Sequence, residues 1–311
     1  MKFIKPRYWD TTKFNILPYI LLPFSILILL LAKLKNTLIK ENVFRVPIIC
    51  IGNIYLGGTG KTPLSHYISE FINVKLKKKT AIIKKFYKDQ LDEINLLEGY
   101  NQKVITSSSR ISAIKNAIKK KFAVIVMDDG LQDNSIKKDL KIVCFTSEQG
   151  MGNGFTIPSG PLRESINALN SCQIAIINGK KNLDLEKRIK KKSPKIKIFY
   201  SYYSPINTIY FKGRKLFAFA GIGNSKNFFK TIEDSNLIIL KKKVFPDHFI
   251  YSKNDYNRLK KISKDNNLKL ITTEKDFYRL KKMGFKRSNV LKIKLKIKKE
   301  KELIYEIKKY I

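Results

Sequence analysis

The sequence predicts an α/β protein: two α/β/α domains of the P-loop type with mainly parallel sheets, preceded by an N-terminal hydrophobic membrane-anchor helix. Three observations support this fold class. An apolar run that starts at Ile48 leads into a glycine-rich turn ending in Gly60-Lys61-Thr62. Short apolar runs then alternate with helical spacing, and 19 uncharged residues lie between Lys13 and Lys33. A chain of 311 residues, 43% of them apolar, is large enough for two packed cores.

The N-terminal segment Phe14–Ala32 is dominated by Leu and Ile and carries no charge. Its length is just enough to cross a bilayer, but Pro18 and Pro23 interrupt a helix near its start, and positive residues flank both ends. We therefore expect residues 1–40 to form an interfacial or shallowly inserted anchor on the cytoplasmic leaflet. One full membrane span and an ordinary hydrophobic core helix are the alternatives.

The next part of the chain, residues 41–207, has the pattern of a P-loop nucleotide-binding domain. Apolar runs predict strands and 3.6-residue spacing predicts helices. In chain order these are the strand from Ile48, the helix Pro63–Phe71, the strand Thr80–Ile83, the helix Ile111–Lys121, and the strands Phe122–Met127, Lys141–Phe145 and Gln173–Ile177. Such alternation implies a parallel sheet whose ligands bind at the carboxyl ends of the strands.

A second alternation predicts a smaller C-terminal α/β domain, residues 208–311. Its elements are the strand Phe217–Ala220, the helix Ser225–Asp234, the strand Leu237–Leu240, the helix Asn254–Asp265 and the strand Leu268–Thr272. The boundary is placed near the turn Pro205–Arg214, where Gly213 and a basic pair interrupt the apolar pattern.

The glycine-rich turn is the strongest functional signal. Backbone N–H groups in such a turn face phosphate oxygens, the lysine reaches the outer phosphates, and the hydroxyl of Thr62 is suited to ligate Mg²⁺. The predicted ATP-binding residues are Gly57, Gly58, Thr59, Gly60, Lys61 and Thr62. The P-loop pattern asks for a glycine five residues before Gly60, where this chain has Tyr55. The loop is therefore a variant, and an ordinary strand-to-helix turn is the alternative.

Two adjacent acids, Asp128 and Asp129, follow the apolar run Phe122–Met127. A carboxylate at the end of a strand beside a P-loop is suited to hold the Mg²⁺ of a bound triphosphate. We therefore predict a metal site made of Thr62, Asp128 and Asp129, while a plain turn before Gly130 is the alternative.

The formal charge of +38 invites nucleic acid, an anionic membrane surface or an anionic substrate as partners. Lysine runs such as Lys190–Lys192 and Lys241–Lys243 lack the interleaved aromatic residues that single-strand binding requires. No nucleic-acid partner is expected. The three cysteines show no metal-ligand or disulfide spacing.

Several short blocks, taken in order, resemble the family of tetraacyldisaccharide 4'-kinases, which act on the lipid A precursor. These blocks are Val46-Pro47, Gly52-Asn53, Gly57–Pro63, Asp128–Gln132, Gly152–Gly154, Pro158–Glu164, Ala220–Asn224, Phe228-Phe229, Phe245–His248 and Thr273–Asp276. The resemblance covers nearly the whole chain. It implies transfer of the ATP γ-phosphoryl group to the 4'-hydroxyl of an acylated glucosamine disaccharide 1-phosphate, giving lipid IVA at the cytoplasmic face of the inner membrane.

The resemblance also implies roles for individual residues. Lys61, Asp92, His248 and Asp129 become the expected catalytic residues, with Asp92 and His248 assisting deprotonation of the sugar hydroxyl. Asn53, Arg163 and Glu164 are expected to bind the substrate. ATP and Mg²⁺ are the implied cofactors, and an anionic membrane surface is the implied partner.

The chain departs from this family in three ways. Lys84-Lys85-Phe86-Tyr87-Lys88 stands where the family has Ser-Arg-Gly-Tyr-Gly, the loop from there to Asp92 is very short, and Asp133 replaces a histidine. Two other classes stay open: a membrane-associated P-loop NTPase switch, which gives no reason for the later blocks, and a basic nucleic-acid-binding ATPase, which leaves the apolar anchor unused.

Overall fold

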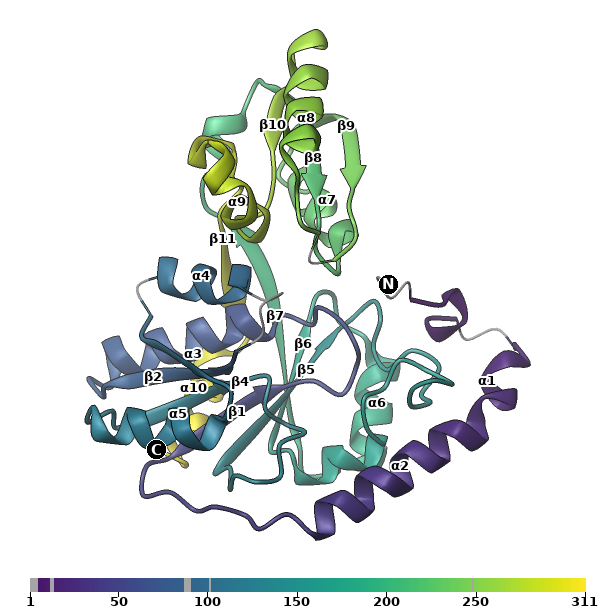
Figure 1. The fold of residues 1–311 in the computed structure, drawn as a ribbon, viewed down its shortest axis with the longest axis vertical. Coiled ribbons are helices and arrows are strands. Elements are labelled where there is room, and N and C mark those ends of the chain that lie inside the picture. Colours follow the sequence, from purple (N-terminus) through teal and green to yellow (C-terminus); the bar gives the residue numbers. More distant parts are fainter. Residues whose placement is uncertain (1–4, 12–13, 87–90, 101, 248) are drawn as a thin grey trace. The chain divides into compact units, whose positions relative to one another are not determined.

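A computed structural model describes residues 5–11, 14–86, 91–100, 102–247 and 249–311, with only the backbone described at 91–93. The chain divides into two compact units (Figure 1). Unit 1 contains Met1–Lys85, Ile105–Tyr202 and Ile297–Ile311, and unit 2 contains Phe86–Val104 and Tyr203–Lys296. The ranges predicted from sequence differ from this division, because 86–104 belong to the second unit and 297–311 to the first.

The larger sheet has eight strands in the order β11-β7-β6-β5-β1-β4-β2-β3 (Figure 1). Their bounds are β1 Ile48–Gly52, β2 Thr80–Lys85, β3 Val104–Ser107, β4 Val124–Asp128, β5 Leu140–Thr146, β6 Ile174–Asn178, β7 Lys197–Pro205 and β11 Ile293–Ile297. β1 pairs in parallel with β4 on one side and β5 on the other. The predicted α/β class with mainly parallel sheets is therefore confirmed.

The central strands are buried along their whole length, which explains their continuous apolar sequences. All five residues of β1 and all five of β4 are buried. A strand covered on both faces cannot alternate polar and apolar side chains. The flanking helices are α3 Lys61–Lys75, α5 Arg110–Lys119, α6 Leu183–Lys192 and α10 Glu300–Lys308, with the 3₁₀ turn Ile166–Ser171 before β6.

The predicted anchor is divided between two helices, α1 Leu17–Ile20 and α2 Leu22–Thr37. Pro18 and Pro23 stand in their first turns, where proline costs no helical hydrogen bond. Within the described parts of the chain, no helix has both the length and the apolar character needed to cross a membrane. A single spanning or anchoring helix is therefore not confirmed.

The N-terminal segment is fixed to a loop of unit 1. Trp9, in the 3₁₀ turn Arg7–Trp9, is buried, and its indole N–H donates to the carbonyl of Pro158 at 3.1 Å. The hydroxyl of Ser25 on α2 is buried against Ser159, 2.8 Å from that residue's hydroxyl. A side chain at Gly152 would lie 2.4 Å from the carbonyl of Trp9, so the Gly152–Gly154 block supports this packing.

Unit 2 contains a three-stranded sheet in the order β10-β8-β9, and both pairings are parallel. The strands are β8 Lys215–Ala220, β9 Ile238–Val244 and β10 Lys269–Ile271, and the helices are α4 Leu91–Gly99, α7 Ser225–Glu233, α8 Lys253–Asp265 and α9 Glu274–Leu280. Three short 3₁₀ turns are Thr208–Phe211, Lys281–Met283 and Arg287–Asn289. Alternate residues of β8 enter two cores: Leu216 and Ala218 pack in one, whereas Phe217 and Phe219 pack in the other.

Candidate functional site

The glycine-rich loop between β1 and α3 has the backbone of a phosphate-binding loop. Gly57 and Gly60 have φ angles of 140° and 89°, which only glycine adopts without strain. Gly60 caps α3, whose first residue is Lys61. The hydroxyl of Thr59 is buried and has no hydrogen-bond partner among the described residues. An unpaired buried hydroxyl at a helix N-terminus fits a phosphate oxygen.

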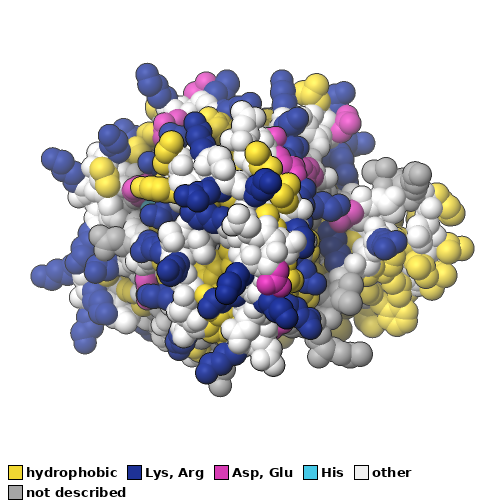
Figure 2. Space-filling view, turned by 90° about the horizontal axis from the view of Figure 1, so that it is seen from above, with side chains coloured by type: hydrophobic (Ala, Val, Ile, Leu, Met, Phe, Trp, Pro, Cys, Tyr) yellow, Lys and Arg dark blue, Asp and Glu magenta, His cyan; other side chains and the backbone are white. Residues whose placement is uncertain are grey.

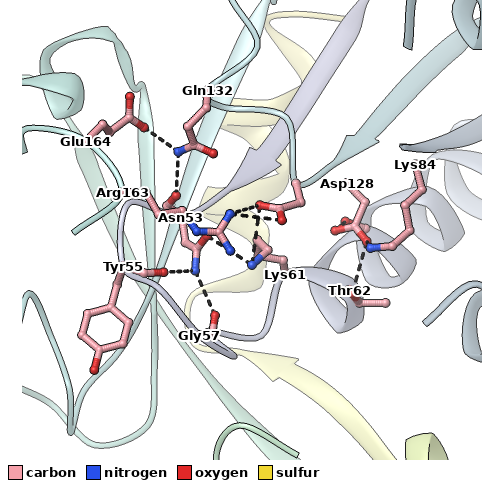
Figure 3. Close-up of polar contacts among 12 residues, drawn as sticks. Asn53, Tyr55, Gly57, Lys61, Thr62, Lys84, Asp128, Gln132, Arg163 and Glu164 are labelled. Carbon is pink, nitrogen blue, oxygen red and sulfur yellow. Dashed lines mark hydrogen bonds and ion pairs between the residues drawn. The ribbon is translucent and has the colours of Figure 1, made fainter. Parts of the chain in front are cut away.

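Asn53 holds this loop in shape. Its side-chain amide donates to the carbonyl of Tyr55 at 2.5 Å and to that of Gly57 at 3.0 Å, and its Oδ1 accepts from Lys61 Nζ at 3.1 Å (Figure 3). Asn53 is fully buried. The structure thus places this predicted substrate-binding residue beneath the phosphate loop, with both amide atoms engaged by it.

Tyr55, which stands where the pattern asks for glycine, has a structural use. Its side chain is fully buried, its hydroxyl donates to Asp10 Oδ1 at 2.5 Å, and it accepts from Lys5. Its ring lies below Gly57, where an added Cβ would be 3.6 Å away. The tyrosine therefore joins the loop to the N-terminal segment.

Asp128, at the end of β4, lies beside the start of α3. Its carboxylate accepts from the hydroxyls of Thr62 and Ser65, each at 3.1 Å, and from Lys84 Nζ at 2.8 Å (Figure 3). Neither Ser65 nor Lys84 carries a recognisable signal of its own in the sequence. The parallel pairing of Lys84 with Asp128 across β2 and β4 brings them together, and that register is set by the fold.

Asp129, the second residue of the acid pair, contacts Lys61 of the phosphate loop. Its φ is 59°, and its N–H donates to the carbonyl of Ile51 at 2.8 Å. Its carboxylate contacts Arg163 Nη1 at 3.0 and 3.2 Å and Lys61 Nζ at 3.6 Å. Burial alone would raise the pKa of Asp129, but Lys61, Arg163 and Lys84 together hold it below its usual range.

The Pro158–Glu164 block is tied to the same place. The N–H of Arg163 donates to the carbonyl of Ile54 at 2.7 Å. The amide of Gln132 bridges two segments, because it donates to the carbonyl of Asn53 at 2.9 Å and to Glu164 Oε1 at 2.6 Å. Burial raises the pKa of Glu164. This block therefore supplies the arginine that contacts Asp129 and an acid beside the loop.

Asp133, which replaces the family's histidine, forms an ion pair with Arg110 at 3.0 Å. Arg110 also donates to the carbonyl of Asp129 at 2.6 Å. Burial would raise the pKa of Asp133, but hydrogen bonds from Ser135 and Arg110 lower it. The substitution thus supports the turn that carries Asp129.

Eight of the predicted site residues therefore come together in unit 1: Asn53, Thr59, Lys61, Thr62, Asp128, Asp129, Arg163 and Glu164. Asp92 lies on α4 in unit 2, and its side chain is not described. His248 lies outside the described residues.

The residues present fit Mg²⁺ as a cofactor. The hydroxyl oxygen of Thr62, at the start of α3, lies 3.1 Å from a carboxylate oxygen of Asp128, at the end of β4. A hydroxyl and a carboxylate placed in this way are the protein ligands of Mg²⁺ in a P-loop site. In the described part of the chain no group of three His, Cys, Asp or Glu side chains is placed to hold a metal ion. Mg²⁺ commonly retains water and phosphate oxygens as ligands, so one hydroxyl and one or two carboxylates suffice.

The Thr273–Asp276 block has a structural role in unit 2. Asp276 is fully buried and accepts from the N–H of Gly221 at 3.1 Å, the hydroxyl of Tyr251 at 2.8 Å and that of Thr273 at 2.7 Å. Arg279 contacts the same carboxylate at 3.1 Å. The block therefore fixes the Ala220–Asn224 turn in place.

This geometry places the chain in the class of P-loop nucleotide-binding proteins. The family model described as tetraacyldisaccharide-1-P 4'-kinase matches residues 17–311, and the chain belongs to that family. A tetraacyldisaccharide 4'-kinase of Pelagibacter ubique is 41% identical over 306 residues, which is 97% of this chain and 96% of the relative. One of Rickettsia bellii is 32% identical over 298 residues and 90% of each chain.

The fold is similar to a solved structure, that of LpxK from Aquifex aeolicus in complex with ATP. The TM-score is 0.69 at 23% identity, and the match covers 94% of this chain and 99% of the other. The family model and the two relatives confirm the predicted family and the predicted kinase activity. Membership of this family favours the kinase over the NTPase switch and the nucleic-acid-binding ATPase.

Proposed function

We propose that this protein transfers the γ-phosphoryl group of ATP to the 4'-hydroxyl of tetraacyldisaccharide 1-phosphate. The 4'-oxygen forms a bond to the γ-phosphorus, the bond from that phosphorus to the β–γ bridging oxygen breaks, and ADP leaves. The hydroxyl proton passes to a base of the protein. The observation that carries the proposal is the ordered cluster of Lys61, Asp128 and Asp129 around the phosphate loop, in a chain of this family.

The loop residues bind and orient the triphosphate. Backbone N–H groups of Gly57–Lys61 and the hydroxyl of Thr59 face the phosphates, and the dipole of α3 adds positive potential. Lys61 Nζ, held by Asn53 and Asp129, is positioned to stabilise the charge that develops on the transferred group. Arg163 fixes Asp129 from the other side.

Thr62 and Asp128 would hold Mg²⁺, and the bound ion would supply neutralisation of phosphate charge. For the acceptor, the family resemblance nominates Asp92 and His248 as the pair that removes the hydroxyl proton. A carboxylate that orients a histidine gives a base suited to neutral pH.

We propose that α1 and α2 hold the protein at the cytoplasmic face of the inner membrane, where the acyl chains of the acceptor remain. Figure 2 shows apolar side chains gathered over this segment. The exposed residues are Phe14, Ile16, Leu17, Tyr19, Ile20, Phe24, Ile26, Leu27, Ile28, Leu30, Leu31 and Leu34. A contiguous apolar surface of this kind is typical of a membrane contact.

The decisive experiment uses detergent-purified protein, γ-labelled ATP, Mg²⁺ and tetraacyldisaccharide 1-phosphate. We expect label in the lipid, and we expect Lys61→Ala to reduce its rate of appearance by about 10²- to 10³-fold, because a charge stabiliser of the transition state is lost. Lys78→Ala, at an exposed position beyond α3, is the matched control. Unlabelled lipid in the presence of bound ATP would show that the acceptor is a different molecule.

A further inference from the structure

Lys84 is a buried cation in direct contact with the proposed metal site. Its side chain is 3% exposed, and that of Asp128 is fully buried. Lys84 Nζ lies 2.8 Å from Asp128 Oδ2, the same oxygen that accepts from Thr62.

A lysine and a divalent cation make competing demands on one carboxylate. Without metal, the ammonium compensates the charge of Asp128, which would be costly to bury alone. With metal, the same ammonium stands close to a second cation and repels it. Its effect on Mg²⁺ binding is therefore unfavourable, while its effect on the metal-free protein is favourable.

We propose that Lys84 is a positioning residue that sets the Mg²⁺ requirement of this kinase by competing with the ion for Asp128. This inference rests on the proposed function, because it assumes that Mg²⁺ binds beside Thr62. Lys84 keeps Asp128 oriented toward α3 before metal arrives, so the site is formed in advance. The cost of that arrangement is weaker metal binding than a serine would allow.

The test compares wild-type protein with Lys84→Ser and with Lys84→Met, which removes the charge but keeps most of the packing. Calorimetric titration with Mg²⁺ in the presence of a non-hydrolysable ATP analogue gives the metal affinity. Electron paramagnetic resonance with Mn²⁺ alone gives it without nucleotide. Lys78→Ser, which removes an exposed lysine in the turn before β2, is the matched control.

We expect both Lys84 variants to bind the metal ion at least about fivefold more tightly, because one repelling charge is gone. We also expect their melting temperatures without metal to fall, whereas the control is unchanged. A lower melting temperature with unchanged metal affinity would mean that Lys84 is only structural. Weaker metal binding by the variants would mean that Lys84 favours the metal ion instead of competing with it. Wild-type protein that binds no nucleotide at any Mg²⁺ concentration would instead count against the proposed function.

A separate observation concerns a cavity of about 540 Å³ within unit 2. Its lining residues include five cations and no carboxylate: Lys212, Arg214, Lys269, Arg287 and Lys292, with Asn207, Ile209, Tyr210 and Ser288. Such crowding of like charges is unfavourable, and a bound anion relieves it.

The walls of this cavity are held by specific contacts. Asn207 accepts from the N–H of Lys292 and donates to the carbonyl of Val290, both at 2.8 Å, while Lys269 Nζ donates to the carbonyl of Tyr210 at 3.0 Å. Ile209 and Tyr210 are 68% and 67% exposed. Apolar and aromatic side chains beside cations are characteristic of a contact with the headgroup region of a membrane.

We infer that this cavity binds the phosphate headgroup of an anionic lipid. The inference rests on the proposed membrane association. The test is flotation with vesicles that contain phosphatidylglycerol and with neutral phosphatidylcholine vesicles. The variant combines Lys212→Ala with Arg214→Ala. The control combines Lys253→Ala with Lys261→Ala, both on α8.

We expect the first pair to weaken binding to anionic vesicles by about 30-fold, since each basic residue near a membrane contributes on the order of 1 kcal/mol and two are removed, and to leave binding to neutral vesicles unchanged. An equal loss in the control pair would show that only net charge matters. Saturation of the cavity by free glycerol phosphate, with vesicle binding unaffected, would assign it to a soluble phosphate ester. Loss of binding to neutral vesicles alone would concern α1 and α2 rather than this cavity.

Discussion

At the scale of single residues, the site is organised by side chains that support the loop as much as by those that face the ligand. Asn53, Tyr55 and Gln132 use their polar atoms to connect β1, the phosphate loop and the N-terminal segment. Their function is to hold Lys61 and Asp129 within a few ångströms of each other. A rigid surrounding of this kind is what charge stabilisation in a transition state requires.

Tyr55→Gly restores the usual P-loop glycine and yet is expected to destabilise the protein by about 3–5 kcal/mol, because it empties a buried ring-sized volume. Tyr55→Phe, which loses only the hydroxyl contacts with Asp10 and Lys5, is expected to cost about 1–2 kcal/mol. Urea unfolding measures both. A glycine variant as stable as wild type would show that the tyrosine does not support the loop.

Asp129 gives a pH prediction with a definite sign. Its folded pKa lies below the usual 3.8, so its ionised form stabilises the folded protein above that pH. This contribution is lost as the pH falls through the lowered folded pKa. We expect the stability of Asp129→Asn to decline less steeply than that of wild type below about pH 4. The raised pKa of Glu164 acts in the opposite direction but is common to both proteins. Parallel acid limbs in thermal unfolding would contradict the prediction.

At the scale of helices and strands, local sequence and burial explain which elements are predictable. β1 and β4 are continuous apolar runs because both faces are covered, and α3 follows a glycine cap. β7, β11 and α6 are absent from the predicted elements, because none of them contains a continuous buried apolar run: lysine alternates with apolar residues in β11 and dominates α6, and β7 mixes serine with aromatic residues. In β11 only Leu295 is buried, and in α6 only Leu185 and Ile189 are buried. Such elements depend on their neighbours for stability.

Asp276 carries the element-scale prediction. Its buried carboxylate joins the Gly221 turn, Tyr251 and α9, so Asp276→Ala removes the acceptor of several buried donors and the carboxylate that Arg279 contacts. We expect a loss of about 3–5 kcal/mol in the stability of unit 2. Asp234→Ala, at the exposed end of α7, is the control and should change stability little. Hydrogen exchange of β8 amides measures the effect, and unchanged protection would refute it.

At the scale of the whole molecule, exposed apolar side chains are concentrated on the N-terminal segment, whereas basic side chains are widely distributed. Figure 2 shows Lys and Arg side chains scattered over the viewed face, whereas the apolar side chains gather over α1 and α2. Removing the N-terminal segment would also uncover the loop that Trp9 and Ser25 cover. Substitution is therefore a cleaner test of the membrane contact than deletion.

We expect Leu27→Ser combined with Leu31→Ser, both exposed on α2, to weaken vesicle binding by at least about 100-fold, since each leucine buried in the membrane contributes on the order of 1.5–3 kcal/mol. Kinase activity toward detergent-dispersed acceptor should remain. The control is Val74→Ser, which replaces an exposed apolar residue on α3. Leu185→Ser would not serve, because Leu185 is buried in the core and its loss destabilises α6. Undiminished vesicle binding by the α2 variant would place the membrane contact elsewhere.

By itself, the sequence determined the α/β class, the phosphate loop, the acid pair and the family, because glycine conformations, buried apolar runs and a lysine next to a threonine are local requirements. Only the tertiary structure decided that Lys84 contacts Asp128 and that Tyr55 contacts Asp10. It also decided that 86–104 belong to unit 2 and 297–311 to unit 1. These outcomes depend on strand register and on packing between distant segments. Contacts of that kind are set by the whole fold and leave no periodic signal in the chain.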